Sequence, residues 1–182
     1  DRATRKFIAE MNFCGLDPDQ IFFFCQGNLP AVDAMTGHLL LDACDHVAVA
    51  PDGHGGMLQA LTKSGGLDWF LQQDCQTLVS FQVDNPLAKP LDPEFLGYHL
   101  LSGSSLSTQV IQKIDPSERV GVVVESGGAT RIIEYSDLPE AIAAERLPDG
   151  RLRFFAGSIG IHAFQRNFLE KVASSKTSLP LH

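Results

Sequence analysis

Short apolar runs alternate with amphipathic stretches along nearly the whole of this 182-residue chain. Runs such as residues 21–25 and 77–83 have the length and continuous apolar character of strands that are buried on both faces. Stretches such as residues 57–62 and 67–73 carry apolar side chains at helical spacing. Strands that alternate with helices predict an α/β fold with a largely parallel sheet.

The second half of the chain adds a β-rich region. Gly127 and Gly128 separate two runs of β-forming residues and predict a hairpin. Asp92-Pro93-Glu94 has the pattern of a helix start, with Pro at the first helical position, and predicts a helix that ends near Leu101. The other predicted strands are residues 39–41, 47–49, 108–114, 120–125, 130–135, 152–155 and 159–164, and the other helices are residues 3–13, 137–144 and 167–172.

The composition excludes several classes of protein. A net charge of −8 argues against the basic face with which proteins bind a nucleic acid backbone. No run of about 18 apolar residues occurs, so no membrane span is predicted. The four cysteines form no Cys-x-x-Cys pair, which argues against a zinc cluster. We expect a cytoplasmic protein with reduced cysteines. Because the chain has no initiator methionine, we expect it to be a piece of a longer protein.

Ligands of α/β sheets bind beyond the carboxyl ends of the strands, and three such positions carry suitable residues. They are residues 26–31, 51–56 and 84–87. The glycine-rich stretch at residues 53–56 precedes a predicted helix, so its backbone N–H groups can meet an anion or a ring carbonyl. The same glycines can also form only a turn that leads into the helix.

Asp84 is the main candidate for chemistry because it lies at the tip of a predicted buried strand. Magnesium in proteins is held by one or two carboxylates together with substrate phosphate oxygens, so a single Asp in an open site suffices. Alternatively, Asp84 makes an Asx-turn that leads into Pro86. A serine hydrolase is not indicated, because no Gly-x-Ser-x-Gly motif accompanies His54.

An ordered set of short motifs runs along nearly the whole chain. The motifs are Gln26-x-x-Leu-Pro-Ala31, Ala50-Pro-Asp-Gly-x-Gly-Gly56, Val83-Asp-Asn-Pro86, Asp92-Pro-x-Phe-x-Gly97, Glu118-x-Val-Gly-Val-Val123, Ile133-Glu-Tyr-Ser136, Asp149-Gly-Arg-Leu152, Phe155-Ala-Gly-x-Ile159 and Leu179-Pro-Leu-His182. In order and spacing this set resembles the eukaryotic-type UDP-sugar pyrophosphorylases, and within them the UDP-N-acetylhexosamine pyrophosphorylases.

The resemblance implies a Rossmann-like nucleotidyltransferase core with a mixed, mostly parallel sheet and an added β-hairpin region. Residues 1–182 would be the central part of a single catalytic domain. The implied reaction forms a UDP-sugar and pyrophosphate from UTP and a sugar 1-phosphate with the help of Mg²⁺. By similarity, Gln26 and Gly53 would face the uracil, and Asp84 would lie by the metal and the phosphates. His54, Gly121, Glu134 and Ser158 would line the sugar pocket.

The chain departs from the N-acetylhexosamine branch at two positions. That branch usually carries asparagine where this chain has His54 and Ser158, whereas the glucose and broad-specificity branches share Gly-His-Gly. Overall similarity still favours N-acetylglucosamine 1-phosphate as the substrate, with a UDP-glucose or broad-specificity enzyme as the alternative. An inactive, nucleotide-sugar binding family member and a purely structural α/β domain are the two alternatives of other classes.

The family's Gly-x-Gly-Thr-Arg loop with its following Lys does not occur in this sequence, and the basic residues expected after His182 do not either. These groups would supply most of the positive charge around the triphosphate. We therefore expect the chain on its own to be inactive. The sequence makes no prediction about the oligomeric state.

Overall fold

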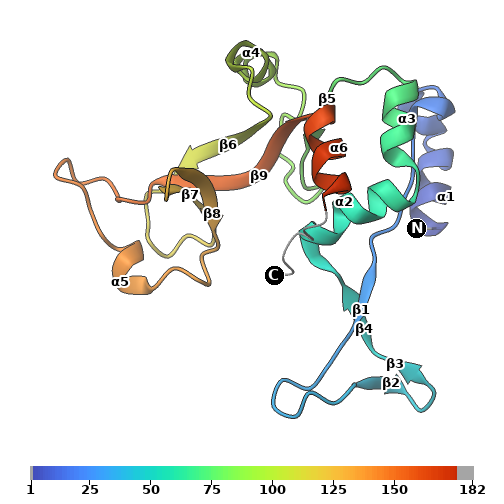
Figure 1. Ribbon diagram of the computed structural model, residues 1–182, viewed down its shortest axis with the longest axis horizontal. Helices are drawn as coiled ribbons and strands as arrows, with labels where there is room; N and C mark the ends of the chain where they lie inside the picture. Colours follow the sequence, from blue (N-terminus) through green and yellow to red (C-terminus); the bar gives the residue numbers. More distant parts are fainter. Residues whose placement is uncertain (1, 176–182) are drawn as a thin grey trace. The chain divides into compact units, whose positions relative to one another are not determined.

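The computed structural model describes residues 2–175 and divides the chain into two compact units. Unit 1 contains the chain up to Gln76 and the segment that begins at Arg166, and unit 2 is Thr77–Gln165. Unit 2 is therefore inserted into the sequence of unit 1 (Figure 1). The last predicted motif, at residues 179–182, lies outside the described residues.

Unit 1 is mainly helical. Its α-helices are α1 (Arg2–Glu10), α2 (Gly53–Lys63), α3 (Gly66–Gln72) and α6 (Arg166–Ser174), with 3-10 turns η1 (Asn12–Gly15) and η2 (Pro18–Gln20). Helix α2 packs on α3 and α6, and Leu61 and Leu67 are the large side chains buried there. These helices confirm the helical predictions for residues 57–62, 67–73 and 167–172.

Two short antiparallel pairs complete unit 1. Strand β1 (Asn28–Pro30) pairs with β4 (Val49–Pro51), and β2 (Leu41–Ala43) pairs with β3 (His46–Val47). The prediction of a buried strand at residues 21–25 is wrong. The Phe23 carbonyl accepts a hydrogen bond from Arg5 at 3.2 Å, and the Phe22 ring stacks on Trp69. Side-chain contacts with helices take the place of a strand partner in this segment.

The sheet of unit 2 is organised around one long strand, β9 (Ala156–Gln165). Its neighbours are β5 (Thr77–Ser80), β6 (Leu106–Gln112) and β7 (Val122–Ser126), and β8 (Ala129–Ile133) pairs with β7. Strand β6 pairs with both halves of β9, so β5 and β7 share its other edge. The side chains of Val122, Ile161 and Ala163 form the buried core of this sheet.

Every strand pairing among residues 2–175 is antiparallel, so the predicted, largely parallel sheet is wrong for the described part of the chain. Parallel neighbours need a crossover connection, usually a helix. Helix α4 (Pro93–Ser102) connects β5 to β6, which do not pair with each other. Helix α5 (Glu140–Ala143) is only one turn long. The fold is a mixed α/β fold with antiparallel sheets.

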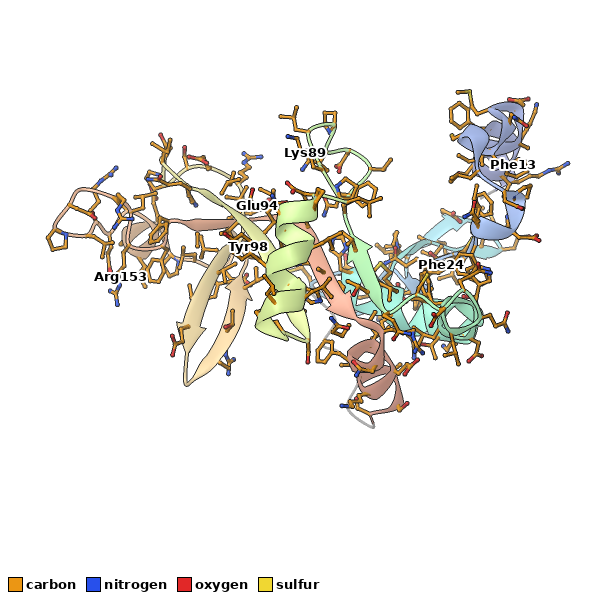
Figure 2. The ribbon with its side chains drawn as sticks, turned by 90° about the horizontal axis from the view of Figure 1, so that it is seen from above. Phe13, Phe24, Lys89, Glu94, Tyr98 and Arg153 are labelled. Carbon is orange, nitrogen blue, oxygen red and sulfur yellow. The ribbon has the colours of Figure 1, made fainter. Side chains whose placement is uncertain are left out.

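In unit 2 the predicted strand at residues 152–155 is wrong, because these residues form a turn and an isolated bridge before β9, whereas two other local predictions are confirmed. Gly127 and Gly128 have φ angles of +62° and +75° and form the tight turn of the β7–β8 hairpin, as predicted. Asp92 caps α4 by accepting a hydrogen bond from the Glu94 N–H at 2.9 Å. Figure 2 shows Glu94 and Tyr98 on this helix. No helix among the described residues combines the length and the apolar character needed to cross a membrane.

His99 ties α4 to the sheet and is almost completely buried, at 1% exposure. Its Nδ1 lies 2.8 Å from the Ser107 hydroxyl and its Nε2 lies 3.1 Å from the Gln165 amide nitrogen. Burial lowers the pKa of His99 below its ordinary value of 6.5 because it disfavours the charged ring. The imidazole is therefore a neutral structural group of unit 2, as expected for a histidine with satisfied partners.

This burial predicts a pH dependence of stability. The unfolded chain takes up a proton at His99 near pH 6.5, whereas the folded chain resists it, so the free energy of unfolding should fall as the pH drops below 6.5. We expect His99→Gln to reduce the loss of stability between pH 7.5 and pH 5.5, measured by urea unfolding. His38→Gln, at an exposed histidine, should keep the wild-type slope. Equal slopes in all three proteins would contradict the prediction.

Candidate active site

The first group of predicted site residues lies at the end of the β1–β4 pair in unit 1. The register Asn28↔Pro51 brings the residues before β1 beside those after β4. The Gln26 side-chain amide donates to the Gly53 carbonyl at 2.5 Å. Gly53 begins α2 with a φ of +72°, a conformation that favours glycine, and His54 follows as an exposed residue in the first turn. The N–H groups of that turn have no acceptor within the helix.

Asp52 is the residue of this group that sequence reasoning missed. Its carboxylate lies between Gly27 and Gly56, where a Cβ added at Gly56 would come within 2.0 Å of the Asp52 Cγ and one at Gly27 within 2.4 Å of Oδ2. Its Oδ1 is sealed from solvent and has no hydrogen-bond partner among the described residues. The available signal was the pair of glycines on either side, because both are needed to leave room for this side chain.

The second group lies in unit 2, at the open end of the β7–β8 hairpin. Gly121 precedes β7 and Glu134 follows β8, and the register Val122↔Ile133 places them next to each other. The Ser158 N–H donates to the Gly121 carbonyl at 2.8 Å. A Cβ at Gly121 would lie 3.4 Å from both Glu134 carboxylate oxygens and 3.0 Å from Ile132. The structure thus brings Gly121, Glu134 and Ser158 together, whereas His54, the fourth residue assigned to the sugar pocket, belongs to unit 1.

Asp84 lies in the turn that follows β5 and is exposed. Its carboxylate makes no hydrogen bond or ion pair with any of residues 2–175. The alternative prediction, an Asx-turn at Asp84, is not what the loop contains: Asn85 makes that turn, with its side-chain oxygen accepting from the Leu87 N–H at 3.2 Å. The Asp84 carboxylate is therefore available to a ligand.

The described residues fit only a magnesium site in which the protein supplies a single carboxylate. No group of three or more His, Cys, Asp or Glu side chains among them could enclose a metal ion. A lone, unpaired carboxylate is the donor set that suits Mg²⁺ when substrate phosphates and water supply the remaining ligands. Asp84 meets this description, whereas Asp52, whose Oδ1 is sealed from solvent, does not.

A family model for UTP–glucose-1-phosphate uridylyltransferases matches residues 1–176. The chain is 37% identical over 177 residues to UDP-N-acetylglucosamine diphosphorylase 1 of Arabidopsis thaliana, covering 96% of this chain and 35% of that protein. It is 38% identical to the human UDP-N-acetylhexosamine pyrophosphorylase-like protein 1 over 169 residues, covering 93% of this chain and 33% of that protein. The chain spans about a third of the length of these curated relatives.

The fold is similar to a solved structure of the Trypanosoma brucei uridine diphosphate N-acetylglucosamine pyrophosphorylase, determined with an inhibitor. The TM-score is 0.86 at 27% sequence identity, and the match covers 98% of this chain and 36% of the other. These matches confirm the resemblance that the motifs carried. The chain belongs to the UTP–glucose-1-phosphate uridylyltransferase family, the family of the UDP-sugar pyrophosphorylases.

Proposed function

We propose that the protein to which this chain belongs is a uridylyltransferase that forms a UDP-sugar and pyrophosphate from UTP and a sugar 1-phosphate. Family membership over residues 1–176 supports this proposal. The relatives named above are UDP-N-acetylhexosamine and UDP-N-acetylglucosamine enzymes by name, which supports N-acetylglucosamine 1-phosphate as the substrate. Residues 1–182 are proposed to be the central part of its catalytic domain. We also propose that the whole protein has a Rossmann-like core and is cytoplasmic.

In the proposed reaction, a phosphate oxygen of the sugar 1-phosphate attacks the α-phosphorus of UTP. A new phosphoanhydride bond forms, the bond from the α-phosphorus to the bridging oxygen breaks, and pyrophosphate leaves. Catalysis of this kind depends mainly on positioning and charge neutralisation, and no protein nucleophile is needed. When bound, Mg²⁺ supplies charge neutralisation at the phosphates, and Asp84 is the residue proposed to hold it.

The contact of Gly121 with Ser158, beside Glu134, is the observation that carries the proposal. A Cβ at Gly121 would contact both Glu134 carboxylate oxygens, so glycine leaves that side of the carboxylate free of a side chain. Carboxylate oxygens accept hydrogen bonds from hydroxyl groups such as those of a sugar ring. Gln26 and the first turn of α2 offer amide donors and acceptors of the kind that read a uracil ring.

UDP-glucose remains the second candidate product because of the side chains at two positions. His54 and Ser158 stand where the N-acetylhexosamine branch usually carries asparagine, so both side-chain amides of that branch are absent here. His54 is exposed at the start of α2. A competition titration with UDP-glucose and UDP-N-acetylglucosamine distinguishes the two products directly.

Replacing Glu134 by alanine in the full-length protein should weaken UDP-sugar binding by about 1–3 kcal/mol, the cost of a lost hydrogen-bond partner at a binding site. Calorimetric titration with UDP-N-acetylglucosamine and Mg²⁺ measures this change, and the affinity for UTP should stay near that of wild type. Glu125→Ala is the matched control, because Glu125 is an exposed carboxylate of the same hairpin. If the wild-type protein binds neither nucleotide, the proposed function is wrong.

A further inference from the structure

Unit 2 contains a cavity of about 270 Å³ that shares no residue with the candidate active site. Its charged lining consists of Lys113, Arg146, Asp149 and Arg151. Lys113 directly follows β6, and its N–H donates to the Phe155 carbonyl at 2.7 Å. The other wall is the turn between Arg146 and Leu152, which pair across an isolated bridge. A cavity of this volume holds several water-sized molecules.

Lys113 is the unusual residue of this cavity because it is a buried cation, at 3% exposure. Its ammonium makes no ion pair or hydrogen bond with residues 2–175. Two side-chain atoms among these residues are sealed from solvent without a hydrogen-bond partner, Asp52 Oδ1 and Gln109 Oε1. The Lys113 ammonium is not one of them, so although unpaired it is not fully sealed from solvent. Lys113 is one of the residues that line the cavity.

The carboxylates nearest to Lys113 in sequence accept their hydrogen bonds from other residues. Asp115 accepts from both the N–H and the hydroxyl of Ser117, at 2.8 and 2.6 Å. The Glu118 carboxylate accepts from the Ile114 and Asp115 N–H groups, at 2.9 and 2.7 Å. These hydrogen bonds are the main cause that holds the pKa of each carboxyl group below its ordinary value. The charge of Lys113 also lowers the pKa of both groups, and that of Arg146 lowers the pKa of Asp115, although neither cation makes an ion pair with them.

The residues that line the cavity include more cations than carboxylates. Asp149 pairs with Arg151, with a distance of 2.7 Å from the Arg151 Nε to the Asp149 carboxylate. The Arg146 guanidinium donates from one nitrogen to the Gly150 carbonyl at 2.8 Å and makes no ion pair with a described carboxylate, so its other donors are available. The lining therefore has three cations and one carboxylate, within a chain whose net charge is −8.

We propose that this cavity, the Lys113 cavity, binds a small oxyanion of the phosphate class, held by the Lys113 ammonium and the Arg146 guanidinium. An unpaired buried charge destabilises a fold, and a bound anion offsets that cost. Lysine offers a point charge and arginine a planar fork of donors, and both are common ligands of phosphate oxygens. The proposal does not rest on the proposed function of the protein.

The test is calorimetric titration of inorganic phosphate into the full-length protein, with sodium chloride at matched ionic strength as the reference. Wild type should bind phosphate saturably. Lys113→Met, which keeps the apolar stem of the side chain, and Arg146→Gln should each weaken phosphate binding about tenfold or more. Arg153→Gln is the control. Arg153, labelled in Figure 2, is an exposed cation of the same segment. It pairs with Glu145 and does not line the cavity. Its phosphate affinity should equal that of wild type.

A phosphate response no larger than that of chloride, or one that is unchanged in Arg146→Gln, would overturn the proposal. Arg146 is exposed, so this variant decides the question even if Lys113→Met does not fold. The same variants titrated with UTP identify the source of the anion. A loss confined to inorganic phosphate indicates a free ion, and a parallel loss for UTP indicates a nucleotide phosphate. Because Glu134→Ala leaves this cavity intact, the proposed function and the anion site can fail independently.

Discussion

Asp84→Asn in the full-length protein is expected to lower kcat by about 10²- to 10³-fold, the typical effect of removing one group that stabilises charge in a transition state. Asparagine keeps the shape of the side chain but cannot neutralise a metal ion. Because the Asp84 carboxylate makes no hydrogen bond with a described residue, the substitution should leave the melting temperature unchanged. Steady-state kinetics over a Mg²⁺ titration measures the effect and should show a higher Mg²⁺ requirement.

Asp45→Asn is the matched control for this prediction. Asp45 is an exposed carboxylate in the turn between β2 and β3, outside the candidate site. Its kinetics and its Mg²⁺ requirement should equal those of wild type. Wild-type kcat in Asp84→Asn at saturating substrate would remove Asp84 from the proposed metal site while leaving the sugar-pocket proposal untouched.

Gly56→Ala is expected to destabilise the full-length protein by about 3 kcal/mol, at the upper end for an overpacked buried site. The new Cβ would lie 2.0 Å from the Asp52 Cγ and within 2.3 Å of both carboxylate oxygens, so the whole Asp52 side chain must leave its place. The strain falls at the start of α2, where Gly53 and Gln26 meet, and UTP affinity should fall as well. Urea unfolding and calorimetry measure the two effects.

Two controls separate this collision from a general effect of alanine. Gly97 lies inside α4 with open space where a Cβ would be, so Gly97→Ala should stabilise by up to about 1 kcal/mol. In an Asp52→Ala background, Gly56→Ala should lose its cost, and the coupling energy of this double-mutant cycle reports the contact. Additive effects of Asp52→Ala and Gly56→Ala would show that the collision is not the cause.

Local structure was largely predictable from the sequence, and strand partners were not. The cap at Asp92 and the turn at Gly127-Gly128 depend on residues that are neighbours in the chain, and both were predicted correctly. The direction of pairing depends on contacts between distant segments, such as Leu78 with Phe164. An apolar run has the same appearance in a parallel and in an antiparallel sheet, which is why the parallel prediction failed.

In the candidate site, too, the sequence was a weaker guide to contacts between distant segments than to local features. Gly121, Glu134 and Ser158 were grouped with His54 through the family resemblance. The register of β7 and β8 places Gly121 beside Glu134, and the Ser158 N–H donates to the Gly121 carbonyl, whereas His54 belongs to unit 1. The strand-end rule pointed to Gln26, but this residue precedes β1 and does not follow a strand. Asp52 was missed because its role depends on the space beside Gly27 and Gly56, which only coordinates reveal. The roles of the seven site residues stay predictions until the variants are measured.

The position of β9 has a consequence for the order in which the chain folds during synthesis. Strands β5, β6 and β7 all pair with β9, and β9 is the last strand of unit 2 to leave the ribosome. Until β9 has been added, only the β7–β8 hairpin can form within this sheet. Strands β5 and β6 remain unpaired until then, and exposed strand edges are prone to aggregation. A nascent chain stalled just before β9 is therefore the species that most needs a chaperone.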